Sequence, residues 1–93
     1  MAKFVIKKDG SREVFDPEKV RGAIRSAAQS VNLPVSRVEE LVEEISSPVL
    51  RLADGKEEIQ TSELRDETLK ELDMVEPQVS EAWRQHDRSK GKV

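Results

Sequence analysis

The chain has 93 residues and a formal net charge of −3 at pH 7, and hydrophobic and charged residues make up 35% and 38% of it. This fits one compact domain, residues 1–93, with little material for a large catalytic cleft, while the lack of cysteine and the single histidine exclude disulfides, thiolate metal sites and multi-histidine centres. No apolar run reaches the roughly 18 residues of a membrane span and the first residues lack a signal peptide's apolar stretch, so we expect no membrane partner and a cytoplasmic location.

Two short strands, residues 4–6 and 12–15, flank an Asp-Gly turn signal and predict a β-hairpin. Loop length decides which side chains share a face, because side chains alternate along a strand. A two-residue loop would mix apolar and acidic groups on one face. We favour a three-residue loop that ends with Gly10 in the left-handed conformation. Its cross-strand partners are Phe4 with Val14 and Ile6 with Arg12.

This register divides the hairpin into two faces. The face expected to join the core holds Phe4, Ile6 and Val14. The opposite face holds Val5, Lys7, Glu13 and Phe15. Because that second face is half apolar and half charged, it is typical of a surface that another group covers rather than of a plain solvent face.

Helices are expected directly after the hairpin. Asp16 caps the first helix, Pro17 occupies its first position, and an apolar stripe of period 3.6 continues to about Ser30. A capping-box pattern at Ser36 opens the second helix, which Pro48 either kinks or shortens by a turn.

The remaining segments predict further helices. Residues 58–60 are too short to assign alone but fit a third strand beside the hairpin, and Thr61 or Ser62 then caps a third helix. A fourth helix begins near 76–77 and ends in a polar tail, residues 88–93, that we expect to be disordered. The predicted fold class is therefore α+β: an N-terminal β-hairpin, possibly with a short third strand, packed on a bundle of about four helices.

Charge is unevenly distributed along the chain. Residues 1–25 hold seven basic and four acidic residues, whereas residues 36–76 hold five basic and thirteen acidic ones. An anion would be attracted to the N-terminal part, while the acidic middle would repel the long phosphate track of a duplex. We therefore expect a small anionic ligand and regard direct nucleic-acid binding as disfavoured.

No arrangement typical of catalysis accompanies this pattern. The helical neighbours of His86 supply neither a nucleophile nor metal ligands, and the acidic pairs are typical of solvated faces. The four glycines are scattered and form no Walker-type loop. We therefore expect no enzyme activity, no catalytic residue and no metal site.

One group of polar residues is a candidate binding site: Lys7, Lys8, Glu13, Lys19, Thr61 and Arg65. Lysines can hold a phosphate chain as point charges, and backbone N–H groups at the start of the third helix add to that hold. The simpler interpretation is a cross-strand ion pair between Lys7 and Glu13, with the other charges serving solubility. The charge pattern alone favours this simpler interpretation.

Two motifs resemble the ATP-cone family. Residues 5–20 match its opening signature, an apolar residue, a Lys-Lys-Asp-Gly turn, then Glu, an apolar residue, Asp and Lys-Val. Residues 59–64 are similar to the family's segment before its third helix, an apolar residue followed two positions later by Thr-Ser-Glu-Leu. The resemblance covers roughly residues 3–75 and assigns no site residue to the fourth helix.

ATP-cone domains are regulatory modules that bind ATP or dATP, at the N-terminus of ribonucleotide reductase large subunits and in a repressor of reductase genes. The resemblance implies that ten positions contact the nucleotide: Val5, Lys7, Lys8, Glu13, Phe15, Asp16, Lys19, Val20, Thr61 and Arg65. Lys7, Lys8 and Arg65 would face phosphates. Val5, Phe15 and Val20 would form the wall against adenine. Glu13, Asp16 and Thr61 would supply polar selection.

With the resemblance added, the preferred hypothesis is a non-catalytic ATP/dATP-binding regulatory domain, with Mg²⁺ accompanying the nucleotide. It would act allosterically on a protein partner, on further copies of itself or on a fused domain. The alternative is a protein-interaction module of the same fold that has lost nucleotide binding and uses an apolar rim of Val5 and Phe15. A nucleic-acid-binding repressor is disfavoured because the repressor relatives carry a cysteine-rich zinc ribbon, which this chain cannot form without cysteine.

Overall fold

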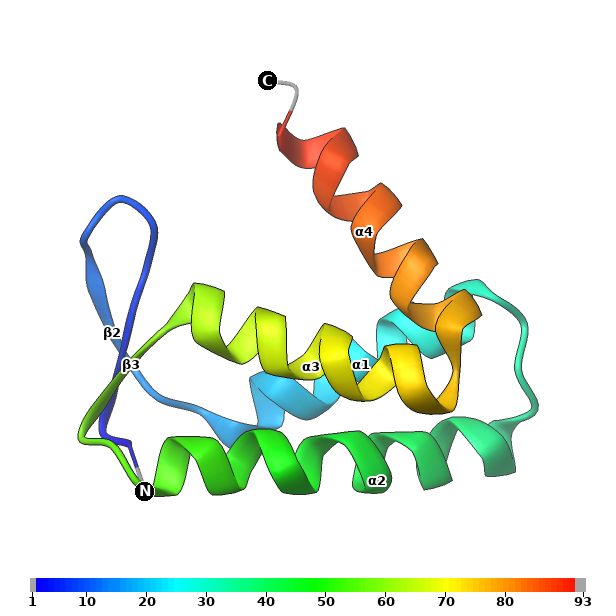
Figure 1. Cartoon of the computed structure of the whole chain (residues 1–93), viewed down its shortest axis with the longest axis horizontal. Helices are drawn as coiled ribbons and strands as arrows, with labels where there is room; N and C mark the ends of the chain where they lie inside the picture. The colour runs from blue at the N-terminus through cyan, green and yellow to red at the C-terminus, as the bar shows by residue number, and fades with distance from the viewer. Residues whose placement is uncertain (1, 92–93) are drawn as a thin grey trace.

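A computed structural model describes residues 2–91 and shows a small sheet beside four helices (Figure 1). The strands are β1 (Phe4–Ile6), β2 (Arg12–Val14) and β3 (Glu58–Gln60). The helices are α1 (Pro17–Ser30), α2 (Val35–Asp54), α3 (Thr61–Val75) and α4 (Pro77–Gly91). The predicted α+β class is therefore confirmed, including the short third strand.

The sheet has the order β2-β1-β3, with β2 antiparallel and β3 parallel to β1. The antiparallel partners are Phe4 with Val14, Val5 with Glu13 and Ile6 with Arg12, which confirms the register of the three-residue loop. Gly10 has a φ of 87°, the left-handed conformation that this loop requires. The backbone N–H of Gly10 donates to the carbonyl of Lys7 at 2.9 Å and closes the turn.

The prediction of the buried hairpin face was wrong. Val14 is 72% exposed, and the guanidinium of Arg12 lies 5.0 Å from the centre of the Phe4 ring on that side. Phe15 is only 8% exposed, and it packs with Ile59 of β3 in a buried cluster against which Val5 also packs. The reason is tertiary, because the C-terminal part of α2 contributes to that same cluster and covers the Val5 side of the sheet.

Helix α1 forms as the sequence predicts. Asp16 Oδ1 accepts a hydrogen bond from the backbone N–H of Glu18 at 3.0 Å, and Pro17 is the first helical residue. Ile24 and Ala28 are fully buried on its inner face. The helix ends at Ser30, and the positive φ of Asn32, 61°, lets the chain turn toward α2.

Helix α2 begins without the predicted capping box. Pro34 occupies the N-cap with a φ of −58° and no side-chain cap forms, so the helix begins at Val35. Glu39, which a Ser36 capping box would need, instead accepts two hydrogen bonds from Arg25 at 2.9 and 3.0 Å. The helix also continues through Pro48 to Asp54, without splitting off a last turn.

Helix α3 has its cap at Gln60, one residue before Thr61 and two before Ser62, the two predicted caps. The side chain of Gln60 accepts from the backbone of Glu63, and Glu63 Oε2 accepts from the Gln60 backbone N–H at 3.0 Å. Thr61 and Ser62 are therefore the first helical residues and not the cap. Within residues 2–91 the Thr61 hydroxyl has no hydrogen-bond partner, so it is available to a ligand.

Helix α4 is longer than predicted. It extends to Gly91, so residues 88–91, which we expected to be disordered, are helical, and residues 92–93 of that tail lie outside the described part of the chain. Because its first turns are anchored on α3, each further residue adds a backbone hydrogen bond at little nucleation cost.

Two clusters of buried side chains hold these elements together. The larger joins α1, α2, α3 and α4 through Ile24, Ala28, Val38, Leu41, Val42, Ile45, Leu72 and Val79. The smaller lies beneath the sheet and contains Ala2, Phe15, Leu50, Ala53 and Ile59. Val20 packs against both clusters and so ties the hairpin to the helices. None of the helices in residues 2–91 has the length and apolarity needed to span a membrane.

Candidate functional site

A cleft of about 1090 Å³ opens between the hairpin, α1, the first half of α3 and α4. In Figure 1 the hairpin and α4 project from the two ends of α3 on the same side of that helix, and α2 lies on the other side. All ten residues predicted from the sequence line this cleft: Val5, Lys7, Lys8, Glu13, Phe15, Asp16, Lys19, Val20, Thr61 and Arg65. Segments more than 50 positions apart in the chain are thus brought to one place.

The hairpin supplies a charged wall. Glu13 Oε2 lies 3.0 Å from Lys7 Nζ, and Glu13 Oε1 lies 4.0 Å from Lys19 Nζ of α1. The hydrogen bond from Lys7, its positive charge and that of Lys19 lower the pKa of the Glu13 carboxyl, so this group is ionised at neutral pH. Lys8 has no carboxylate partner in the described part of the chain.

The ion pair that the simpler interpretation required between Lys7 and Glu13 is therefore present, but it lies on the wall of a cleft and not on an open surface.

The apolar part of the cleft is continuous with the smaller core. Phe15 is buried in that core, and Val5 and Val20 pack against it while also lining the cleft. Asp16 lines the cleft beside them and uses one carboxylate oxygen to cap α1. A flat apolar ligand group placed here would lie on a surface that the protein core holds rigid.

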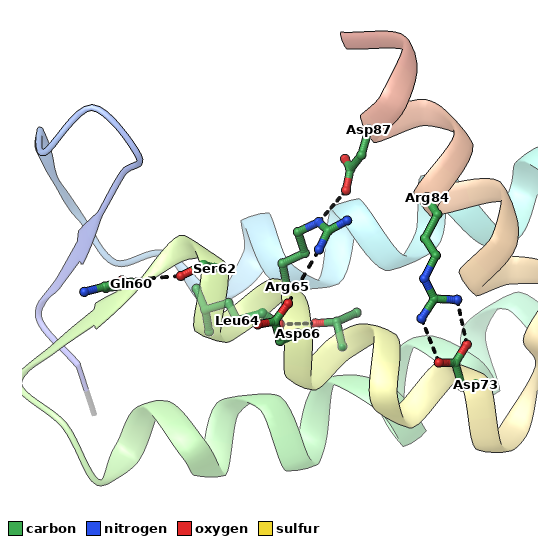
Figure 2. Close-up of polar contacts among 9 residues, drawn as sticks. Gln60, Ser62, Leu64, Arg65, Asp66, Asp73, Arg84 and Asp87 are labelled. Atoms are coloured by element: carbon green, nitrogen blue, oxygen red, sulfur yellow. Dashed lines mark hydrogen bonds and ion pairs between the residues drawn. The ribbon is translucent and has the colours of Figure 1, made fainter. Parts of the chain in front are cut away.

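The start of α3 forms the third side. Thr61 and Ser62 occupy the first positions of the helix, where backbone N–H groups lack intrahelical partners and attract anions. Arg65, one turn later, lines the same cleft. Its Nε donates to Asp87 Oδ2 of α4 at 2.5 Å, and its Nη1 lies 3.5 Å from Asp66 (Figure 2).

Helix α4 supplies a fourth side that the sequence analysis did not assign. Trp83, Arg84, Asp87 and Arg88 line the cleft. They occupy positions i, i+1, i+4 and i+5, which lie on one face of a helix, and this is the one sequence signal that groups them, although it does not say what that face meets. The family resemblance that guided the site prediction did not reach this segment. Other lining residues that were not predicted are Val14, Ala23, Ser62, Leu64 and Thr68.

Arg84 is held in place by α3. Its two terminal nitrogens donate to both carboxylate oxygens of Asp73 at 2.9 and 2.7 Å (Figure 2), and the Ser80 hydroxyl donates to Asp73 Oδ1 at 2.5 Å. These bonds lower the pKa of Asp73 from 3.8 to about 2, with the Arg84 bonds having the largest effect.

The cleft is positive although the chain is acidic. Six basic residues line it, Lys7, Lys8, Lys19, Arg65, Arg84 and Arg88, against three acidic ones, Glu13, Asp16 and Asp87. The whole chain has a net charge of −3. Positive charge gathered in a concave site concentrates anions there, so this arrangement favours a ligand with several negative charges. The described residues include no group of three or more acidic or histidine side chains placed to hold a metal ion.

Comparison with known proteins relates this chain to one family of domains. The chain matches the family described as ATP cone domain over residues 3–87. It is 32% identical over 72 residues to the transcriptional repressor NrdR of Petrotoga mobilis, covering 77% of this chain and 47% of that protein. It is 36% identical over 69 residues to NrdR of Kosmotoga olearia, covering 74% of this chain and 42% of that protein.

The chain spans less than half the length of these two relatives. Both relatives are named transcriptional repressors. The family match covers nearly all of the described residues and includes every residue of the cleft except Arg88, and the chain therefore belongs to the ATP-cone family.

Proposed function

We propose that this ATP-cone domain binds ATP or dATP in the cleft and, without catalysing a reaction, regulates a fused domain or a separate partner. The observation that carries the proposal is that all ten predicted nucleotide-contacting residues line one cleft whose basic residues outnumber its acidic ones by six to three. Family membership supports the same ligand class.

The distribution of side chains in the cleft suggests how the nucleotide lies. Its phosphates face Lys7, Lys8 and Arg65 and approach the N–H groups at the start of α3. The adenine lies against the apolar side formed by Val5, Phe15 and Val20, while Glu13, Asp16 and Thr61 supply polar selection. A volume of about 1090 Å³ accommodates a ligand of this size.

Mg²⁺ enters this proposal with the nucleotide. Mg²⁺ in nucleotide sites is coordinated mainly by phosphate oxygens and water, with one or two protein carboxylates at most. The carboxylates near the proposed phosphate position, Glu13 and Asp87, are each paired with a basic residue. The ion would therefore neutralise part of the phosphate charge and need no protein-built site.

Regulation requires that the nucleotide bind one state of the protein more tightly than another. The relatives are named transcriptional repressors and are more than twice as long as the matched region, so a fused domain, or DNA contacted through one, is a fitting recipient of the signal. Self-association and a separate protein partner are the other recipients that we predict.

The alternative, an interaction module that has lost nucleotide binding, relied on an exposed rim of Val5 and Phe15. Phe15 is only 8% exposed and Val5 is half-buried, so that rim is not offered to a partner. We therefore keep nucleotide binding as the proposal.

Titration of the chain with ATP and dATP in the presence of Mg²⁺ tests it. Trp83 lines the cleft and is the one tryptophan of the chain, so its fluorescence reports occupancy. We expect saturable changes with both nucleotides and a weaker response to CTP, which has the same charge but a different base. No response at millimolar ATP and dATP, by fluorescence and by calorimetry, would reject the proposal, and release of inorganic phosphate by the protein would contradict its non-catalytic part.

A further inference from the structure

The first half of α4 is firmly attached to α3. Val79 is fully buried in the larger core, the Ser80 hydroxyl donates to Asp73, and Arg84 makes two hydrogen bonds to the same carboxylate. The helix is therefore fixed from its first turn to Arg84, and Figure 2 shows the bonds from Arg84 to Asp73.

The second half is attached much more weakly. Residues 85–91 include no large apolar side chain. Gln85 and Arg88 bond only to Glu81 in the same helix. Of the side chains described in this half, only that of Asp87 makes a polar contact with another element, its bond to Arg65 of α3. One ion pair thus holds the far end of α4 against the cleft.

Arg65 has two competing roles. It lines the cleft as a predicted phosphate ligand, yet its Nε donates to the Asp87 carboxylate at 2.5 Å. A guanidinium can be shared between two anions, but a bound polyphosphate beside Asp87 would place like charges together in the cleft. The side chains of this pair are 41% and 33% exposed, so the bond contributes only modestly and is open to exchange.

We propose that Asp87 occupies the position of a ligand phosphate on Arg65, and that a bound polyphosphate displaces it and releases residues 85–91 of α4 from α3. Asp87 is then a specificity-determining residue, because a ligand must bring enough negative charge to replace it. Triphosphates meet that condition, whereas a neutral nucleoside does not. The inference rests on the proposed function for the identity of the ligand, but the displacement of Asp87 from Arg65 depends only on the negative charge of the anion.

Inorganic tripolyphosphate is therefore the probe, with binding measured by calorimetry and α4 followed by amide hydrogen exchange. In the unmodified chain we expect tripolyphosphate to accelerate exchange at residues 85–91. In Asp87→Asn, these amides should exchange up to about fivefold faster without any ligand and change no further on binding, and tripolyphosphate affinity should rise by up to about fivefold.

Asp66→Asn is the matched control. It removes the other carboxylate near Arg65, at 3.5 Å, but Asp66 makes no hydrogen bond or ion pair with the side chains of α4 that the structure describes. We expect this variant to keep the slow exchange of residues 85–91 and their acceleration by tripolyphosphate. Equal behaviour of the two variants, unchanged exchange in the unmodified chain on binding, or failure of tripolyphosphate to bind would overturn the inference.

These outcomes separate the inference from the proposed function. If ATP and dATP bind but the amides of residues 85–91 do not respond, the inference fails and the proposed function remains. If tripolyphosphate releases α4 while ATP and dATP give no binding signal, the proposed function fails and the inference remains.

Discussion

At the scale of single residues, most basic side chains of the cleft already have a carboxylate partner. Lys7 pairs with Glu13, Arg65 with Asp87 and Arg84 with Asp73, whereas Lys8 has no such partner among residues 2–91. At most of these positions a ligand phosphate must replace a carboxylate as the partner of the basic side chain. The free energy gained is therefore only the difference between the new ionic contact and the one that it replaces. The cleft is pre-ordered by these pairs, which reduces the side-chain entropy lost on binding.

Lys7→Ala should weaken ATP binding about fivefold, roughly 1 kcal/mol, because the substitution removes a phosphate contact and leaves the negative charge of Glu13 with only its longer, 4.0 Å contact to Lys19. Lys3→Ala is the matched control, since Lys3 also pairs with a glutamate, Glu57 at 3.7 Å, but lies outside the cleft. Isothermal calorimetry measures both. Equal losses in the two variants would mean that Lys7 is not at the site.

Asp73 gives a prediction for pH. Its pKa is about 2 in the folded chain against an ordinary value of 3.8, so the unfolded state binds the proton more readily. The stabilisation from this group is therefore complete above about pH 5 and is lost as pH falls through about 4 to about 2. Thermal unfolding measured at several pH values should show Asp73→Asn less stable than the unmodified chain at pH 7. The unfolding temperatures of the two proteins should become equal near pH 2.

Glu71→Gln on the same helix is the control for that measurement. Glu71 has no ion-pair partner in the described part of the chain, so its substitution should leave the pH profile of stability unchanged. A difference between Asp73→Asn and the unmodified chain that stays constant from pH 7 to pH 2 would contradict the assignment of the low pKa to this carboxyl.

At the scale of elements, the hairpin turn and α1 each contain a glycine with open space around it, but their backbones differ. Gly10 has a φ of 87°, whereas Gly22 is helical, and a Cβ at either would meet no atom within 4 Å. Gly10→Ala should lower the free energy of unfolding by about 1 kcal/mol through backbone strain alone. Gly22→Ala should raise it by about 0.5 to 1 kcal/mol, since alanine favours the helix.

Urea unfolding of both variants measures these changes. Both variants replace glycine by alanine and add the same volume, but their expected changes in the free energy of unfolding have opposite signs. Each variant is therefore the control for the other. A stabilising Gly10→Ala would show that the three-residue loop does not require the left-handed conformation.

Local sequence signals predicted the hairpin register and the start of α1 because a turn glycine, a capping aspartate and a first-turn proline act within a few residues. They could not decide which hairpin face is buried, since both faces have apolar side chains. That choice depends on Leu50 and Ala53, which α2 brings beneath the sheet from far along the chain. The capping box at Ser36 failed for a similar reason, because Glu39 bonds to Arg25 of α1.

The site prediction was limited in the same way. The ten residues taken from the family resemblance all line the cleft, but their roles toward a nucleotide stay predictions. The residues of α4 were missed because only tertiary packing shows that this helix turns back toward the hairpin. Their helical spacing alone does not say what they face.

At the scale of the whole molecule, an acidic chain presents a basic cleft, so binding of a charged ligand depends on ionic strength. Raising the salt concentration from about 0.1 M to about 1 M shortens the Debye length from about 10 Å to about 3 Å. We expect ATP affinity to fall about tenfold over that range. Adenosine, which has no phosphate charge, should bind weakly with an affinity that salt does not reduce, and a parallel loss for both ligands would contradict an electrostatic origin. Calorimetry at several salt concentrations makes the comparison.

The parallel pairing of β1 with β3 has a consequence for biosynthesis. It joins Val5 to Ile59, 54 positions later, and β3 leads directly into the first turn of α3. Closing so long a loop is slower than forming local helices and turns. On the ribosome, the N-terminal hairpin must wait for residue 60 to emerge before it gains this neighbour. A nascent chain that stalls earlier therefore lacks β3 and the start of α3, so the cleft, and any ligand sensing that we propose for it, is completed only late in synthesis.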